Sequence, residues 1–506
     1  MKIGMVSLGC PKNLVDSEVM LGLAQQQGHQ LTRNAADADV LVVNTCAFID
    51  KAKQESIDTI LEMAEHKKTG ACKRLIVTGC MAERYRDELR AQIPEIDAVL
   101  GTSEVPGIVD AIGSGNGGCD SRQAYTVPLL RSNGQPVVMR PAEATHSSQA
   151  SPSLVRLRAS TDAHSGETSP EPWRRRAVAE REGGGLPTYL YDSNTPRLLA
   201  TPRHYAYVKI AEGCDYKCAF CIIPTLRGHY RSRPIESIVT EAERLAASGV
   251  KELLLVSQDT SFYGNDRGER GSLARLLRAL NRVPGLEWIR MLYLYPTTIG
   301  DEVLDAIAES PKVCRYIDLP LQHASDPVLK RMKRPGTRAS YERLLDRIRT
   351  RLPGVTLRTT FIVGFPGETD ADHAELESFV QSIGFDHVGV FTYSHEEGTT
   401  AHELEDDVPA ALKRRRQSAV MRLQKRIVQR AQRTRVGTRA RLLVDGPSAE
   451  HDLVLRGRLE GQAPDIDPLV YLTECDPSTV PVGQFVEAEI VGSRGYDLLA
   501  RPAALD

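Results

Sequence analysis

Short apolar runs alternate with amphipathic stretches over the first hundred residues of the chain. Three runs, KIGMVS, ADVLVVNT and KRLIVTG, each predict a buried strand that ends in a turn. The stretches between them, such as NLVDSEVMLGLAQQQG, carry apolar residues at helical spacing. Strands that alternate with helices in this way predict βαβ units and a parallel sheet over residues 1–113.

The pattern is lost between about Ser114 and Pro187, where Ser, Pro, Gly and Arg predominate and no period is sustained. Such a composition cannot bury a core, so residues 114–187 are predicted to be a disordered insertion or a long linker. An RRR run at 174–176 offers a weak nucleic-acid contact, but a solvated linker is the preferred interpretation.

Periodicity resumes at HYAYVKIAEGC and continues through five further strand-like runs. They are KELLLVSQDT, EWIRMLYLYP, CRYIDLPLQH, VTLRTTFIVGFPGE and FDHVGVFTYS, and helical stretches separate them. Six β/α units over residues 200–435 predict an open, incomplete (β/α)6 barrel. Because the active site of such a barrel lies at the carboxyl ends of its strands, the polar endings SQDT, LYP, LQH and GFPGE are candidate site segments.

The last two segments of the chain differ in charge. Ten Lys or Arg and no acidic residue lie between Lys413 and Arg435, in a helical pattern that ends the barrel segment. Residues 436–506 hold twelve Asp or Glu, six Arg and no Lys, in short alternating runs with Gly and Pro turns. These runs predict a small antiparallel β-barrel, so the chain as a whole is an α/β multidomain protein.

The totals restrict the class of protein further. A chain of 506 residues with 41% hydrophobic and 26% charged residues and a net charge of −2 is typical of a protein with about three domains and no general affinity for nucleic acid. No membrane span or secretory leader is predicted, so a cytoplasmic location is expected. In that compartment, ten cysteines favour metal binding or catalysis over disulfides.

Three cysteines, Cys10, Cys46 and Cys80, each fall at the carboxyl end of a predicted strand of the first domain. In a parallel sheet those ends share one edge, where open α/β sheets place their ligands. The three thiols are therefore predicted to converge on one site. The alternative is three unrelated buried cysteines.

Cys214, Cys218 and Cys221 form a second group, which follows the first predicted barrel strand with the spacing C-x3-C-x2-C. Zinc sites usually close with four ligands, and no fourth Cys or His stands at a matching spacing. Three thiolates on a four-iron cluster would leave one iron open to a substrate. A zinc site with a distant ligand remains the alternative.

With aromatic Phe220 just before the third cysteine, this motif resembles the radical S-adenosylmethionine superfamily. The resemblance implies that Cys214, Cys218 and Cys221 hold a 4Fe-4S cluster and act in catalysis. It also implies that the open iron chelates S-adenosylmethionine, whose reductive cleavage yields a radical that abstracts hydrogen from carbon.

The chain as a whole is similar to the radical methylthiotransferases, outside the segment 114–187. LGCPKN, NTCAF and TGCMA match the motifs of their first domain, and the last domain resembles their TRAM module. The likeness implies that Cys10, Cys46 and Cys80 hold a second 4Fe-4S cluster, where a sulfide is methylated by another S-adenosylmethionine. The family usually has a shorter connection in place of 114–187, which leaves the role of Cys119 open.

The same likeness implies several cofactor contacts besides Phe220. Ser257 and Gln258 would hold the amino group of S-adenosylmethionine, while Gly364 and Gly367 would let the backbone approach its adenine. Arg358 is predicted to contact the ribose or carboxylate, with a buried structural ion pair as an equal alternative.

The runs VSQDTSFYG, LYLYP, DLPLQHAS and RMKRPGT resemble the branch that modifies an aspartate of small-subunit ribosomal protein S-twelve. The acidic last domain agrees, because it would repel phosphate and attract a basic ribosomal protein. A transfer-RNA adenosine methylthiotransferase is the alternative enzyme, and a non-catalytic iron–sulfur module is disfavoured by the open irons. A reducing electron donor is implied. The basic helix from Lys413 either contacts nearby ribosomal RNA or is a solvated helix packed between domains, and the second interpretation is preferred.

Overall fold

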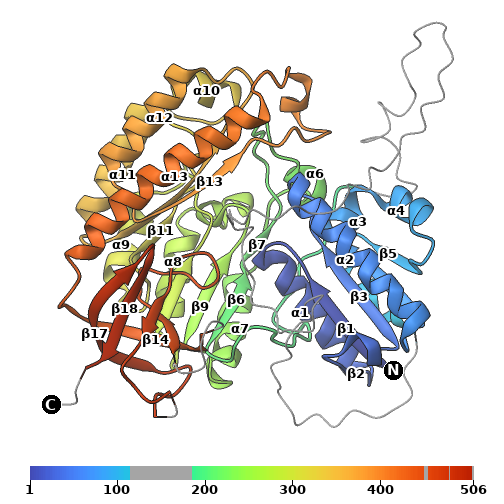
Figure 1. Ribbon diagram of the computed structural model, residues 1–506. Coiled ribbons are helices and arrows are strands. Elements are labelled where there is room, and N and C mark those ends of the chain that lie inside the picture. Colours follow the sequence, from blue (N-terminus) through green and yellow to red (C-terminus); the bar gives the residue numbers. More distant parts are fainter. Residues whose placement is uncertain (114–184, 449–453, 478, 504–506) are drawn as a thin grey trace, which may run out of the picture.

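The computed structural model describes residues 1–113, 185–448, 454–477 and 479–503, arranged as three packed bodies (Figure 1). The predicted insertion and Cys119 therefore lie outside the described residues, apart from 185–187. No helix in the described part of the chain is both long and apolar enough to span a lipid bilayer.

The first body is a parallel sheet of five strands in the order β2-β1-β3-β4-β5. Its strands are β1 (Lys2–Ser7), β2 (Gln30–Leu31), β3 (Val40–Thr45), β4 (Arg74–Gly79) and β5 (Ala98–Leu100). Its helices are α1 (Pro11–Gln26), α2 (Asp50–Thr69), α3 (Cys80–Arg84), α4 (Arg86–Gln92) and α5 (Ile108–Ile112). Every residue of β3 is buried, because helices cover both faces of the sheet.

The second body contains six parallel strands, as the sequence predicts, in the ladders β10-β9-β6 and β11-β12-β13. A single bridge between Ile289 and Val313 joins the two ladders. The strands are β6 (Tyr205–Lys209), β9 (Glu252–Val256), β10 (Trp288–Met291), β11 (Tyr316–Asp318), β12 (Thr356–Val363) and β13 (His387–Thr392). The outer helices are α7 (Ile235–Ala247), α8 (Ser272–Asn281), α9 (Asp301–Glu309), α11 (Arg338–Arg351), α12 (Asp370–Ile383) and α13 (Ala410–Arg433).

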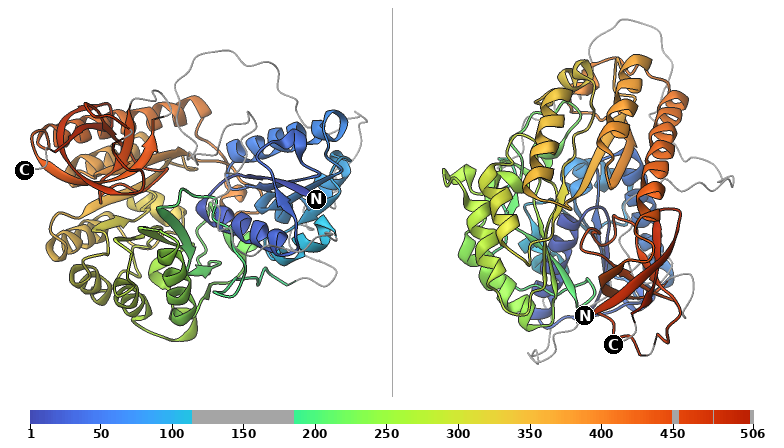
Figure 2. Two further views of the ribbon diagram at one scale, coloured as in Figure 1. Left: turned by 90° about the horizontal axis from the view of Figure 1, so that it is seen from below. Right: turned by 90° about the vertical axis from the view of Figure 1, so that its left-hand side faces the viewer.

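The open seam of this partial barrel, between β6 and β13, is filled by the first body (Figures 1 and 2). Helix α1 packs against β6, and Arg197 Nε donates to Glu18 Oε2 over 2.9 Å. At the other edge, Glu396 follows β13 and accepts from Lys53 and Arg84, each over 2.9 Å. The N-terminal sheet thus completes the wall of the barrel.

The third body is a closed barrel of five strands in the order β14-β15-β16-β18-β17. They are β14 (Arg439–Pro447), β15 (Leu455–Arg458), β16 (Val470–Leu472), β17 (Phe485–Arg494) and β18 (Asp497–Pro502). The predicted small antiparallel barrel is confirmed, with one exception, because β16 and β18 run parallel. Strand direction cannot alternate around a closed ring with an odd number of strands, so one parallel pair is unavoidable.

The segment 459–467 of the third body closes the lower end of the six-stranded barrel, where the strands begin. Ala463 is buried in one apolar cluster with Tyr205, Trp288 and Tyr316, each at the start of a barrel strand. A side chain at Gly461 would place its Cβ 2.4 Å from Thr356 Oγ1, so the approach requires glycine. The small domain therefore forms the floor of the six-stranded barrel.

Candidate active site

The first three cysteines meet at the carboxyl edge of the N-terminal sheet. Cys10 lies between β1 and α1, Cys46 follows β3, and Cys80 opens α3 directly after β4. Gly9 has φ +88°, and a Cβ there would lie 3.1 Å from Cys46 Sγ, which places the turn before Cys10 against Cys46. Burial, and then Cys80 and Cys10, raise the pKa of the Cys46 thiol to about 12. The thiols of these three cysteines, called here the sheet trio, are not joined by disulfides.

One arginine from the barrel reaches the sheet trio. Arg227 ends the short helix α6 (Ile223–Arg227), which begins two residues after Cys221. Its Nη2 donates to Cys80 Sγ over 3.5 Å and also to the side-chain oxygen of Asn13 in α1. A cation that donates to a sulfur ligand favours the thiolate state which iron requires.

Buried charges surround Arg227 at the junction of the two domains. Lys209 at the end of β6 lies 2.5 Å from both Asp16 and Glu212, and Arg227 lies 2.7 Å from Asp16 and 3.1 Å from Glu212. Burial alone would raise the pKa of Glu212, but Lys209 and Arg227 outweigh it and lower the pKa to about 2. Removing one member would leave an uncompensated buried charge, so the network fixes how the domains are oriented.

Lys12 of α1 enters the same space between the domains. Its Nζ lies 3.3 Å from the centre of the Tyr293 ring, beyond the end of β10. Burial lowers the pKa of Lys12, although Cys10 and Glu212 act in the opposite direction. This buried cation stands within two residues of the sheet trio and over an aromatic face that attracts it.

Cys214, Cys218 and Cys221, called here the loop trio, lie on the loop between β7 (Ala211–Glu212) and α6. Backbone bonds of 2.8 Å fasten this loop, from Ala219 N to Met332 O and from Ala401 N to Ala219 O. Burial raises the pKa of both Cys214 and Cys221 to about 12, and Cys218 contributes to each shift.

Two side chains hold the loop trio from outside. Tyr216 donates its hydroxyl to Asp259 over 2.9 Å and stacks on Tyr295 at 3.9 Å between ring centres. Arg334 Nη1 donates to Cys218 Sγ over 3.6 Å. Each trio therefore has one buried arginine bonded to one of its sulfurs, Arg227 at the sheet trio and Arg334 at the loop trio.

The thiols of each trio are free to act as ligands. A four-iron cluster binds each thiolate through a different iron. Both trios consist of three free cysteines with an arginine at hand, which is the donor set that a cluster with one open iron needs.

Of the predicted cofactor contacts, Gln258 has the clearest unused hydrogen-bonding capacity. Its Nε2 donates to Glu212 Oε1, while its buried Oε1 has no hydrogen-bond partner among the described residues. An unpaired buried acceptor is costly, and an ammonium group would satisfy it. Ser257 is buried, with its hydroxyl 3.3 Å from that of Thr260.

Phe220, Gly364 and Gly367 gather near the end of β12. Phe220 packs on a small apolar cluster that includes Phe365 and Tyr393. Gly364 and Gly367 have φ +72° and +75°, and a Cβ at Gly364 would lie 2.3 Å from the side chain of Lys413. These contacts explain the glycines within the protein, so their role toward adenine stays a prediction.

Arg358 stands apart from this group. Its guanidinium bonds to Asp318 over 2.8 Å and to Asp467 of the floor segment over 3.2 Å, both buried carboxylates. The structural ion pair, the alternative given above, is the arrangement that the structure shows. The two carboxylates bond to Nε and Nη1 of the guanidinium, and a contact with ribose or carboxylate stays a prediction.

The network of Asn13, Asp16, Lys209, Glu212 and Arg227 was not predicted. One signal was available, because Asn13 and Asp16 interrupt the apolar positions of a helix whose every side is buried near its start. Polar residues at such positions need partners inside the protein. Which partners they find depends on the domain packing, which no local pattern encodes.

Family comparisons agree with the three bodies. Residues 2–101 match a family described as uncharacterized protein family UPF0004, residues 208–380 the radical SAM superfamily, and residues 436–502 the TRAM domain. The chain is 46% identical over 501 residues to "Ribosomal protein uS12 methylthiotransferase RimO" of Koribacter versatilis, covering 99% of this chain and 96% of that protein. The chain belongs to the RimO family.

Other RimO relatives agree over the same span. The proteins of the same name from Myxococcus xanthus and Trichlorobacter lovleyi are 45% and 42% identical, each over at least 98% of this chain and 90% of the relative. Among solved structures, the radical S-adenosylmethionine methyltransferase TsrM from Kitasatospora setae, with cobalamin and a [4Fe-4S] cluster bound, is 17% identical with a TM-score of 0.47. That likeness covers 77% of this chain and 72% of TsrM.

RimO membership and the radical SAM match make the chain a radical methylthiotransferase. They also imply S-adenosylmethionine and a 4Fe-4S cluster.

Proposed function

We propose that this RimO protein adds a methylthio group to the β-carbon of an aspartate of ribosomal protein uS12. The observation that carries the proposal is that the chain holds two trios of free cysteines, each with a buried arginine on one sulfur, and that Arg227 of the sheet trio ends the helix that follows the loop trio. The relatives named for uS12 favour this substrate over a transfer-RNA adenosine.

We assign the loop trio to the barrel cluster and the sheet trio to a second 4Fe-4S cluster. With S-adenosylmethionine bound, these groups would supply the radical and the sulfur chemistry. Gln258 Oε1 would accept a hydrogen bond from the amino group of the cosubstrate, next to Ser257. Phe220, Gly364 and Gly367 would border the adenine.

The chain's own residues keep the two trios aligned. Lys209 and Arg227 bridge Asp16 of the first domain and Glu212 of the barrel, and these buried pairs leave little room for water. Lys12 would direct its ammonium group toward an aspartate carboxylate that enters between the domains. Such a contact positions the substrate carbon without taking part in bond cleavage.

The acidic barrel is the expected docking face for the substrate protein. Its twelve Asp or Glu against six Arg suit a Lys- and Arg-rich ribosomal protein. The function also requires a reducing electron donor and places the protein in the cytoplasm with its substrate. We propose the domain limits 1–113, 200–435 and 436–506 for these parts.

Peptide mass spectrometry of small-subunit ribosomal proteins tests the proposal, using cells with the gene, without it, and with Cys218→Ala. A methylthio increment on one uS12 aspartate is expected only with the intact gene. Unmodified uS12 in all three strains, with a methylthio group lost from a transfer-RNA nucleoside, would overturn the substrate assignment.

A further inference from the structure

The solvent-facing side of α13 carries cations that form no ion pair among the described residues. Val420 and Leu423 of this helix are buried in the barrel core, and Lys413 and Arg416 pair with Asp406 and Asp370. The remaining exposed cations of the helix are Arg414, Arg415, Arg422, Lys425, Arg426, Arg430 and Arg433. None of these seven forms an ion pair with a carboxylate in the described ranges.

Arg422, Arg426 and Arg430 stand four residues apart, so they line one stripe of the helix and span about 12 Å. Like charges at this spacing destabilise a helix. No acidic residue within α13 offsets that cost. A stripe that reduces the stability of its own helix indicates an external polyanion.

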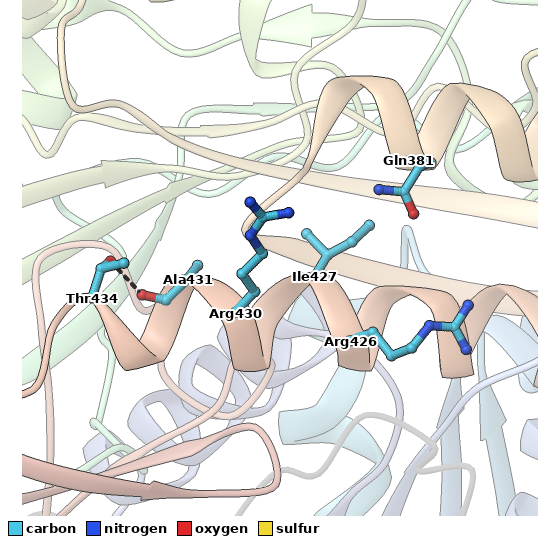
Figure 3. Close-up of a pocket in the computed structure, with 6 residues that line it drawn as sticks. All are labelled: Gln381, Arg426, Ile427, Arg430, Ala431 and Thr434. Atoms are coloured by element: carbon cyan, nitrogen blue, oxygen red, sulfur yellow. Dashed lines mark hydrogen bonds between the residues drawn. The ribbon is translucent and has the colours of Figure 1, made fainter.

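The stripe borders an open hollow between α12 and α13 of about 450 Å³ (Figure 3). Its lining residues are Gln381, Arg426, Ile427, Arg430, Ala431 and Thr434. In Figure 3, Arg430 and Ile427 point from α13 toward the side of the hollow that carries Gln381. The lining contains two guanidinium groups and no carboxylate, so it suits a group that only accepts hydrogen bonds, such as phosphate.

We propose that this face of α13 binds the phosphate backbone of RNA. A protein partner would require aromatic or apolar anchors, but the seven exposed residues are all charged, and no large exposed hydrophobic residue lies within α13. A membrane surface would require an exposed apolar face, and the apolar face of α13 is packed into the barrel. Backbone binding needs only spaced cations.

The identity of the RNA rests on the proposed function. If the substrate aspartate is presented on a small ribosomal subunit, ribosomal RNA is the polyanion beside it. The acidic barrel would then contact the basic protein, and the basic helix would contact the acidic RNA. Two surfaces of opposite charge on one enzyme would fix its orientation on the subunit.

The test uses the full-length protein and a fluorescein-labelled RNA hairpin, with affinity measured across a salt series. Arg422→Glu, Arg426→Glu and Arg430→Glu are combined in one variant. The matched control combines Arg270→Glu, Arg282→Glu and Arg343→Glu, three exposed arginines outside α13. Since each phosphate contact contributes about 0.7–0.9 to the salt slope, the α13 variant should lose about 2–3 from the slope and roughly 100-fold in affinity, and the control little.

Equal losses in the two variants would overturn the proposal. Polyglutamate that competes with the hairpin as well as RNA of equal charge would also overturn it, as would vesicles of anionic lipid that bind the protein more tightly than the hairpin does. The α13 variant should still modify isolated uS12 at the rate of the control, but should act more slowly on assembled subunits. Failure of the proposed function is distinguishable, because both variants and the parent would then leave every uS12 sample unmodified while the hairpin measurements remain readable.

Discussion

The two cysteine trios are brought together in opposite ways, one by a short loop and the other by the pairing of three strands. The loop trio lies within eight residues on one loop, whereas the sheet trio comes from three strands spread over the first eighty residues. The loop trio therefore depends on local backbone contacts such as the bonds of Ala219. The sheet trio exists only when β1, β3 and β4 pair in register.

The comparison shows that a local motif and a topological motif can build equivalent donor sets. Both trios supply three free thiols, and both receive one arginine. The difference lies in what each tolerates. Any change that disturbs sheet register scatters the sheet trio, while the loop trio survives as long as its own loop is fastened.

Replacing each trio by alanine gives the largest expected effect. Changing Cys214, Cys218 and Cys221 to Ala should remove about four irons per chain and abolish S-adenosylmethionine cleavage. Changing Cys10, Cys46 and Cys80 to Ala should remove about as many irons but leave cleavage intact. Iron analysis and 5′-deoxyadenosine assays check this. If the second variant kept full iron content, the assignment of a second cluster would fail.

Glycines beside the trios should separate local from distributed support. A Cβ at Gly213 (φ +86°) would lie 2.1 Å from the backbone oxygen of His229, and one at Gly9 would lie 2.9 Å from Cys46 Cβ. We expect Gly213→Ala to cost about 3–4 kcal/mol of unfolding free energy and Gly9→Ala about 2. Gly249→Ala (φ +105°), with nothing within 4 Å, should cost only about 1.

Denaturant unfolding measures these differences in free energy, and iron analysis shows which trio each substitution affects. Gly213→Ala should lower iron at the loop trio and Gly9→Ala at the sheet trio. A cost at Gly249 equal to that at Gly213 would mean that φ alone, and not the close approach, sets the requirement for glycine.

The two arginines should tune the two clusters separately. Arg227→Gln removes a positive donor from Cys80, and Arg334→Gln removes one from Cys218. Each loss destabilises the more negative, reduced cluster, so its potential should fall by about 40 mV, which equals about 1 kcal/mol for one electron. Redox titration followed by electron paramagnetic resonance would show this. A shift of both clusters in either variant would contradict separate tuning.

The floor segment 459–467 closes the barrel that carries the loop trio. Its contribution to folding stability should depend on pH. Burial, opposed by Arg458, raises the pKa of Asp465 to about 6, and the hydroxyl groups of Tyr205 and Tyr207 contact its carboxyl oxygen at 3.2 and 3.4 Å. A pKa raised by folding stabilises the protein at low pH, and the contribution is lost as pH rises from about 4 to about 6.

Asp465→Asn should therefore remove this pH dependence and raise stability by about 1–2 kcal/mol at pH 8. Asn tolerates the left-handed φ of +66° at this position. Thermal unfolding at pH 4 and pH 8 checks the difference between the two proteins. A variant less stable than the parent at pH 8 would mean that the carboxylate is held by charges, not penalised by burial.

Much of this architecture could be predicted from the sequence, because it follows from the local spacing of apolar residues along strands and helices. The strands that precede Cys10, Cys46 and Cys80 alternate with helices, and topology then forces their ends together. Arg358 and the floor segment could not be predicted, because Asp467 lies more than a hundred residues away and is brought there only by packing. The parallel pair β16–β18 follows from ring closure, which no strand encodes alone.

The filled seam also has a consequence for the order of assembly. The N-terminal sheet is synthesised first, and Asp16 and Glu18 remain without Arg197, Lys209 and Arg227 until the barrel emerges from the ribosome. Glu396, which fastens the far edge, comes later still. The sheet trio is thus reachable from solvent for much of translation, so a ligand of its thiols can bind before the wall closes.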